Sequence, residues 1–277
     1  MAASSTRTPT CGAPIATGDR VICNWKAHGV YYPGRVDQAD GQGSVTIRYD
    51  DGDREETATA RCLHEPAGSR AAPPAPVATA DPDGIAGSYR IVRAANPGGS
   101  AYGGSVAITR GGDVYRFGWT IPGSPGYVGV GLHVGSLLGV GWSTGSAPGV
   151  VVYKVNGGKL DGKWATGSGN GVGTEVLEGP PDLSGSYKIT TGKNPDGSSY
   201  AGSVKITHKG DVYRLAWSIP DTSYAGVGIL KDHVLSVGWG QGAPPGVVAY
   251  SVQGTTLDGV WANPSGSGLG KERLERK

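Results

Sequence analysis

The chain has 277 residues, with 50 Gly, a charged fraction of 17% and a formal net charge of +2. So small a charge argues against nucleic-acid binding, and no apolar stretch reaches the length of a membrane span. Glycine without a three-residue period, interspersed with Val, Ile, Tyr and Trp, is typical of many short strands joined by tight turns. We therefore expect an all-β protein.

Residues 1–17 are rich in Ser, Thr, Ala and Pro, and we expect a disordered tail. The first residues, Met1–Arg7, lack the apolar core of a secretory signal. A cytoplasmic or nuclear location is expected on that ground, with the cell surface as the alternative.

A compact segment is predicted at residues 18–64. Apolar residues alternate with polar ones in short runs that are separated by Gly- and Asp-rich turns. Four or five such strands are enough for a small SH3-like barrel. The expected strands cover residues 20–26, 31–37, 44–50 and 54–60.

This segment also holds aromatic and acidic residues that suit an alkylated cation. Trp25, Tyr32 and Tyr49 supply rings, and Asp51 and Asp53 supply carboxylates. Aromatic faces attract a positive charge, and a carboxylate orients it. These five residues are the predicted ligand-binding site.

Three blocks of this segment resemble, in order, a Tudor domain. The closest likeness is to the methyl-lysine-reading Tudor domains of a checkpoint protein in DNA-break signalling. The resemblance implies that Trp25, Tyr32 and Tyr49 are cage aromatics and that Asp51 receives the ammonium proton. The blocks are Val21–Trp25, His28–Gly34 and Val45–Asp53.

Asp53 departs from this pattern, because the relatives carry another aromatic there. An open cage with an extra carboxylate favours mono- or dimethyl ammonium, or methylarginine, over a trimethyl group. The alternative is a purely structural module, with Trp25 or Tyr49 facing the core and the carboxylates serving as turn formers.

The three cysteines, Cys11, Cys23 and Cys62, form no Cys-x-x-Cys pair and have no His at zinc-site spacing. Cys23 lies in an alternating strand pattern, and we expect it to be a small buried apolar residue. The set neither demands nor excludes an oxidising compartment. No metal and no cofactor is expected.

An Ala- and Pro-rich stretch at 65–83 is predicted to be a semi-rigid linker. After it the sequence repeats directly, with copies at 84–178 and 182–275. Gly87-Ser-Tyr89 returns as Gly185-Ser-Tyr187, Gly112–Arg116 as Gly210–Arg214, and Leu160–Ala165 as Leu257–Ala262.

Each copy, of ~95 residues, is predicted to close its own antiparallel meander barrel of about eight strands. In Asp211–Ile219, for example, Tyr213, Leu215 and Trp217 share one face of a strand. Closure removes the exposed sheet edges. A two-sheet sandwich is the alternative.

Aromatic residues recur at matched positions of the two copies and can line a cavity or a sugar-binding face. For most of them we expect core packing, since they fall on the apolar side of alternating strands. They are Trp119/Trp217, Trp142/Trp239, Trp164/Trp261, Tyr115/Tyr213, Tyr127/Tyr224 and Tyr153/Tyr250.

Matched acids are the only candidates for catalysis. Asp113/Asp211 and Asp161/Asp258 lie next to Gly in predicted turns, whereas Glu175/Glu272 lie near the last strand. Paired carboxylates can act as acid and base, but no His is shared between the copies and no catalytic motif is present. We predict no enzyme activity, and a hydrolase is the least favoured alternative.

The repeat also resembles a small bacterial secreted β-domain of poorly known function that is sometimes labelled fibronectin-binding. Gly173–Leu177 fits its last motif well, and Gly270–Leu274 fits it less well. The resemblance implies a fold more than a function. The missing leader departs from it.

The predicted function is that of a non-enzymatic interaction protein. A Tudor-like domain binds a protein or peptide, methylated on lysine or arginine, and two tandem barrels serve as docking modules. The alternative is a surface or envelope protein whose barrels bind a matrix protein, a glycan or a small ligand.

Overall fold

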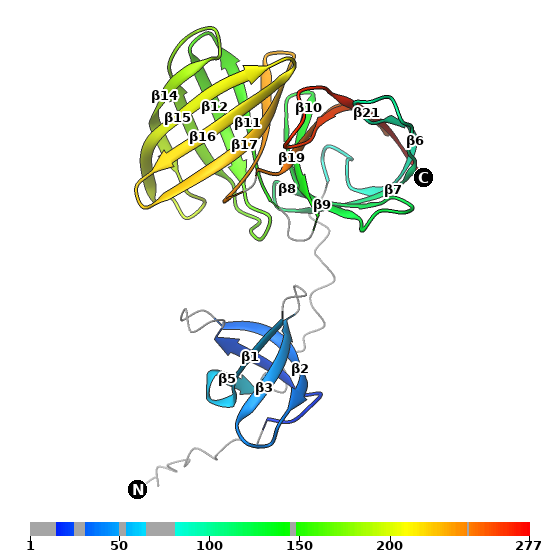
Figure 1. Ribbon diagram of the computed structural model, residues 1–277, viewed down its shortest axis with the longest axis vertical. Coiled ribbons are helices and arrows are strands. Elements are labelled where there is room, and N and C mark those ends of the chain that lie inside the picture. The colour runs from blue at the N-terminus through cyan, green and yellow to red at the C-terminus, as the bar shows by residue number, and fades with distance from the viewer. Residues whose placement is uncertain (1–14, 25–30, 50–53, 65–80, 145–147, 243) are drawn as a thin grey trace, which may run out of the picture. The chain divides into compact units, whose positions relative to one another are not determined.

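The computed structural model (Figure 1) describes residues 15–24, 31–49, 54–64, 81–144, 148–242 and 244–277; for Asn24 and residues 31–33 it describes the backbone alone. Strands make up 66% of the described chain and helix 1%, which confirms the all-β fold class. Two compact units are present, Met1–Val77 and Ala78–Lys277. In the described ranges no helix is both long and apolar enough to cross a membrane.

The N-terminal unit is an antiparallel sheet with the order β4-β3-β2-β1-β5. Its first four strands confirm the expected ones to within two residues at the described ends. The sheet stays open, because β5 pairs only with β1 and no pairing with β4 is seen in the described segments. The expected closed SH3-like barrel is therefore not confirmed. The strands are β1 (Arg20–Asn24), β2 (Tyr31–Ala39), β3 (Ser44–Tyr49), β4 (Arg54–Ala58) and β5 (Cys62–His64).

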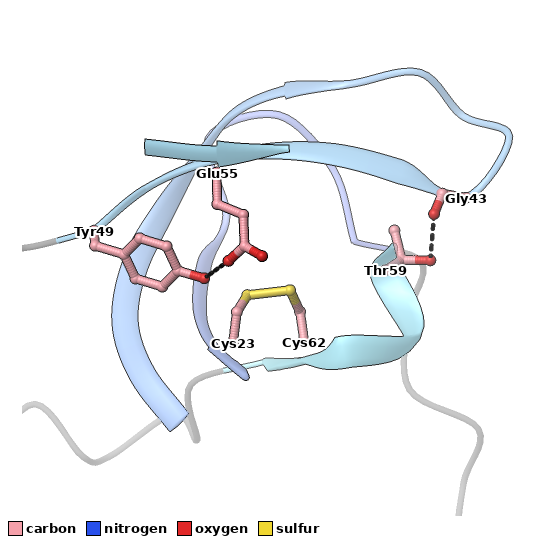
Figure 2. The surroundings of a disulfide bond; sticks show 6 residues. All are labelled: Cys23, Gly43, Tyr49, Glu55, Thr59 and Cys62. Atoms are coloured by element: carbon pink, nitrogen blue, oxygen red, sulfur yellow. Dashed lines mark hydrogen bonds between the residues drawn. A yellow bond between two sulfur atoms is a disulfide. The ribbon is translucent and has the colours of Figure 1, made fainter. Parts of the chain in front are cut away.

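A disulfide joins the first and last strands of this sheet (Figure 2). Cys23 of β1 lies opposite Cys62 of β5 in the strand register, and their sulfur atoms are bonded. Cys23 is fully buried, as expected, but it is one half of a disulfide and not a free apolar residue. The disulfide ties down β5, which has only three residues.

The boundaries of the two units differ slightly from the predicted ones. Ile15 of the expected tail packs against the sheet core, and the Thr17 hydroxyl accepts a hydrogen bond from the Ala39 amide at 3.0 Å. Asp81 and Asp83 of the expected linker both accept hydrogen bonds from the Tyr115 hydroxyl at 2.9 Å. The rest of the tail and linker lies outside the described residues.

The C-terminal unit consists of two closed eight-stranded antiparallel barrels, which excludes the sandwich alternative. Barrel 1 contains β6 (Gly87–Ala95), β7 (Gly104–Gly111), β8 (Val114–Thr120), β9 (Tyr127–Val134), β10 (Leu137–Ser143), β19 (Gly246–Gln253), β20 (Thr256–Ala262) and β21 (Gly270–Arg276). Barrel 2 contains β11 (Gly149–Asn156), β12 (Lys159–Ala165), β13 (Gly173–Glu178), β14 (Gly185–Lys193), β15 (Ser199–Lys209), β16 (Val212–Ile219), β17 (Thr222–Lys231) and β18 (Val234–Gly240).

The two sequence copies exchange strands. Each barrel takes five strands from one copy and three from the other, because β10 pairs with β19 and β11 pairs with β18. In Figure 1 the teal and green strands β6–β10 share a barrel with the orange and red β19 and β21. The expectation that 84–178 and 182–275 each close their own barrel is therefore wrong. Since the copies are so similar, β19 offers β10 nearly the same partner edge as β11.

The segment just before β6 fills one end of barrel 1, and the segment just before β14 fills the same end of barrel 2. In barrel 1, Ile85 is fully buried and its carbonyl accepts a hydrogen bond from the Tyr89 hydroxyl at 2.7 Å. In barrel 2, Leu183 fills the equivalent place, and the Tyr187 hydroxyl donates to the Pro180 carbonyl. We call Ile85 and Leu183 the plug residues.

The outer faces of the two barrels pack against each other. Gly141 of β10 and Gly238 of β18 meet at the centre, where a methyl group on Gly141 would lie 3.1 Å from the Gly238 Cα. Two buried clusters flank this contact, one between β8–β9 and β11–β12, the other between β16–β17 and β19–β20. Their members are Val114, Val130, Leu132, Val150, Val152 and Ala165, and Val212, Val227, Ile229, Val247, Ala249 and Ala262.

The glycine contact gives a first prediction. In Gly141→Ala the new methyl would also lie within 3.0 Å of the Gly149 carbonyl oxygen, so backbone must shift. We expect a loss of about 2–3 kcal/mol or more in the unfolding free energy of the barrel unit. Chemical denaturation measures it. Gly118→Ala is the control, since its methyl meets nothing within 4 Å, and equal stability of the two variants would contradict the close packing.

The disulfide gives a second prediction. Replacing both Cys23 and Cys62 by Ser removes a link across 39 residues. The N-terminal unit should lose about 3–4 kcal/mol of stability, because the unfolded chain gains conformational freedom. Denaturation with and without reductant measures this loss. The barrel unit, which contains no cysteine, is the internal control; an unchanged N-terminal transition would contradict a formed disulfide.

Candidate functional site

Each barrel contains a cavity at the end opposite its plug residue. The volume is about 200 Å³ in barrel 1 (pocket 1) and about 240 Å³ in barrel 2 (pocket 2). The cavities lie where β8, β10 and β20, or their counterparts β16, β18 and β12, come to an end. Pocket 1 is lined by Asn96, Tyr102, Trp119, Ile121, Tyr127, Trp142, Val248, Tyr250, Trp261 and Glu272, and pocket 2 by Val151, Trp164, Glu175, Asn194, Tyr200, Trp217, Ile219, Thr222, Tyr224 and Trp239.

The two pockets are near-copies of each other. Nine of the ten lining residues of pocket 1 have an identical residue at the equivalent position in the lining of pocket 2. The tenth, Tyr250, lines only pocket 1, and Thr222, at a different position, lines only pocket 2. Each pocket is also shared between the sequence copies. In pocket 1, Trp119 and Trp142 come from the first copy, whereas Trp261 and Glu272 come from the second. Strand exchange therefore assembles both pockets.

Aromatic rings form the walls of pocket 1 and meet edge to face. Tyr127 and Trp142 have ring centroids 5.3 Å apart and planes at 87°; Trp142 and Trp261 are 6.0 Å apart at 80°. Tyr102 continues the series against Trp261 at 6.4 Å and 71°. Such near-perpendicular contacts suit the ring quadrupoles, and they place the rings like adjacent walls of a box.

Pocket 2 repeats this geometry closely. Tyr224 and Trp239 lie 5.1 Å apart at 81°, Trp164 and Trp239 lie 5.9 Å apart at 78°, and Trp164 and Tyr200 lie 6.3 Å apart at 70°. The two barrels take their strands from the two copies in opposite proportions, and the ring distances and angles still agree. The ring arrangement is therefore a property of the repeated sequence.

Glycines on neighbouring strands make room for the large rings. A Cβ at any of these glycines would lie within 3.0 Å of the indole that covers it, so no larger residue fits without movement. The pairs are Gly246 with Trp142, Gly270 with Trp261, Gly149 with Trp239, and Gly173 with Trp164.

A buried glutamate forms the floor of each pocket. Glu272 of β21 is 4% exposed, and its Oε1 accepts hydrogen bonds from the Tyr250 hydroxyl and, at 3.1 Å, from the Trp119 Nε1–H. Its Oε2 accepts a hydrogen bond from the Tyr102 hydroxyl at 3.0 Å. Three donors thus converge on one carboxylate.

Glu175 of β13 has the same surroundings in pocket 2. It is 3% exposed, and its Oε1 accepts hydrogen bonds from the Tyr153 hydroxyl and from the Trp217 Nε1–H at 3.2 Å. The Tyr200 hydroxyl donates to Oε2 at 3.2 Å. The glutamate and its three donors recur without change.

Burial sets the electrostatics of this floor. Loss of solvent raises the pKa of Glu175 and of Glu272, and the three hydrogen bonds to each partly oppose that rise. No Lys, Arg or His of the described chain stands among the groups that act on either carboxyl. Each pocket therefore holds an acid whose ionised form has donors but no positive partner.

One indole donor in each pocket lacks an acceptor. The Nε1 atoms of Trp164 and Trp261 are buried and make no hydrogen bond with the residues that the structure describes. Each lies near a tyrosine hydroxyl, that of Tyr200 or Tyr102, without reaching hydrogen-bond geometry. A buried N–H of this kind suits an acceptor on a bound molecule.

The matched aromatic residues thus divide between core and pocket. All six matched tryptophans line a pocket, although core packing was expected for most; Trp119 and Trp217 do pack deeply, at 7% and 6% exposed. Sequence reasoning did not assign Tyr102 or Tyr200 a role. The repeated Asn-Pro-x-Gly-Ser-x-Tyr motif, which ends on them, was the available signal.

The predicted site of the N-terminal unit receives little support. Tyr49 is 3% exposed within the sheet core, and its hydroxyl donates to Glu55 Oε2 at 2.8 Å (Figure 2). This is the position of a core residue and not of an open cage wall. Tyr32 lies on β2, with its side chain undescribed. Trp25, Asp51 and Asp53 lie outside the described residues.

No group of three or more His, Cys, Asp or Glu side chains in the described ranges is arranged to hold a metal ion. Comparison of the chain with models of protein families, with curated proteins and with solved structures found no match. The Tudor-like and secreted-domain resemblances therefore stay predictions.

The buried acids give a third prediction, on pH. A folded-state pKa above the usual 4.5 means that the native state binds more protons than the unfolded state over the pH range between the two values. The unfolding free energy of the barrel unit should therefore fall as the pH rises from about 4.5 through the raised folded-state pKa. Denaturation at several pH values measures this dependence.

In the double variant Glu175→Gln/Glu272→Gln this part of the pH dependence should disappear. Glu178→Gln is the matched control, since Glu178 lies exposed on the same strand as Glu175, and it should keep the wild-type slope. A double variant with an unchanged slope would show that these carboxyls titrate as they do in the unfolded chain.

Proposed function

We propose that this protein is a non-enzymatic binding protein with two equivalent sites for a small organic ligand, one in each barrel. The observation that carries the proposal is the recurrence of the same aromatic walls and glutamate floor in both pockets. A barrel core can be filled completely by side chains. These two barrels instead enclose matching cavities at the end opposite the plug residues.

The size of the cavities limits the ligand. Their volumes of about 200 and 240 Å³ lie below the roughly 300–1,000 Å³ of sites for drug-sized molecules. Apolar rings with a few polar groups among them are the usual composition of such a site. A small molecule, or one small group of a larger one, is the fitting occupant.

The lining chemistry favours binding over catalysis. Glu272 is the only carboxylate among the described residues that line pocket 1, as Glu175 is in pocket 2, whereas acid–base hydrolysis by carboxylates uses a pair. Neither lining set contains a Ser, Cys or His for nucleophilic catalysis. A single carboxylate held by three donors is suited to fix a ligand.

The disulfide supports the alternative location. Disulfides persist in oxidising compartments and are rare in the cytosol, so the Cys23–Cys62 bond favours an envelope or extracellular site of action over the cytoplasmic or nuclear one. Recognition of a methylated peptide by the N-terminal unit remains a separate prediction. It depends on Trp25 and the acidic turn, outside the described residues.

The fourth prediction tests the two-site function. Calorimetric titration with a panel of small cationic, neutral and anionic organic molecules should find compounds that bind twice per chain. Ile121→Trp places an indole at the half-buried edge of pocket 1 and should reduce the stoichiometry to one. Ile219→Trp should do the same for pocket 2, and the double variant should not bind.

Val92→Trp is the control, because Val92 is exposed on β6 of the same barrel, and it should keep both sites. A panel without any binder, or binding that persists in the double variant, would refute the two-pocket proposal.

A further inference from the structure

We infer that each pocket binds a small methylated ammonium compound that carries a hydroxyl or carbonyl oxygen close to the charged group. This inference rests on the proposed function and adds the chemical class of the ligand. It follows from the charge, the hydrogen-bonding capacity and the ring walls of the pockets.

The first step concerns charge. An ionised carboxylate that is 3–4% exposed is costly without a positive partner, and the described residues provide none to Glu175 or Glu272. A cationic ligand in the adjoining cavity supplies that partner. An anionic ligand would add repulsion at the same place.

The second step concerns hydrogen bonds. A carboxylate accepts about four of them, and Glu272 already accepts three, from Tyr250, Trp119 and Tyr102. One acceptor position remains for the ligand. A primary ammonium brings three N–H donors, more than the one position that the carboxylate has left. A fully methylated ammonium has no N–H to satisfy and keeps the charge.

The third step concerns the walls. Methylated ammonium groups are attracted to aromatic faces, and more strongly where the contact is desolvated. Tyr127, Trp142, Trp261 and Tyr102 stand as successive near-perpendicular walls with centroid separations of 5.3, 6.0 and 6.4 Å. A guest between such walls meets rings on several sides, as in an aromatic cage.

The fourth step concerns the free indole donors. Trp261 in pocket 1 and Trp164 in pocket 2 each present a buried Nε1–H without an acceptor. A hydroxyl or carbonyl oxygen on the ligand fills that need. Cavities of about 200–240 Å³ have room for such a compound as a whole, and we assign the ligand to a small free molecule.

The fifth prediction uses choline as the probe, with two close relatives. Ethanolamine replaces the methyl groups by N–H donors, and 3,3-dimethyl-1-butanol has the shape of choline without its charge. Calorimetry on the full chain should give two choline sites, with affinity at least tenfold above that of either relative. Equal affinity for the neutral alcohol would overturn the assignment of a cation while leaving the two-site function intact.

Variants locate the interaction. Glu175→Gln/Glu272→Gln should weaken choline binding at least tenfold and change binding of the neutral alcohol less than threefold, which also shows that the pockets are folded. Glu178→Gln is the control and should bind like wild type. Unchanged choline affinity in the double variant would overturn the role of the glutamates.

Larger molecules that carry the same trimethylammonium group are tested in the same experiment. A trimethyllysine peptide and phosphatidylcholine vesicles should bind more weakly than choline. Binding of either one more than tenfold tighter than choline would overturn the assignment to a small free compound. If no member of the whole panel binds, the proposed function itself fails, and not only its ligand class.

Discussion

The pairing of β10 with β19, and of β11 with β18, is the constraint on which the rest of the barrel unit depends. It sends the chain from one barrel into the other and back, so neither sequence copy is a complete barrel. It places Trp142 beside Gly246 of the other copy, where the indole fits over a bare backbone. It also turns the outer faces of β10 and β18 toward each other, which allows the close approach of Gly141 to Gly238.

The same exchange brings a costly group to the pocket floor. Glu272 belongs to the second copy, but two of its three donors, Trp119 and Tyr102, belong to the first. The donors of this buried carboxylate therefore reach it across the exchanged pairing, and Glu272 is satisfied by residues of both copies. Apolar packing alone would not require an acid here. An acid nevertheless occupies both equivalent positions, as Glu175 and Glu272, and each lines its cavity.

The sequence predicted the strands of the barrel unit but not which strands pair between the two copies. Alternation in Asp211–Ile219 predicted β16 because a strand with one buried face has a period of two. The repeat predicted two barrels of about eight strands, and both formed. Local pattern cannot distinguish β11 from β19 as the partner of β10, since the two strands are copies. For the same reason the sequence could not predict which residues form a pocket. Glu175 and Trp164 of the first copy line the same cavity as Trp217 and Trp239 of the second.

The glycine contact at the centre also joins the two pockets physically. Gly141 precedes Trp142, a wall of pocket 1, and Gly238 precedes Trp239, a wall of pocket 2, and the two backbones are in contact. Neither residue has a side chain that could absorb a displacement, and each is confined further by a carbonyl oxygen of the adjoining strand. A displacement of the backbone beside one indole would therefore press on the backbone beside the other. Close packing at this contact thus couples the backbone of one pocket wall to that of the other and limits the movement of both, because densely packed interiors transmit a local displacement to their neighbours.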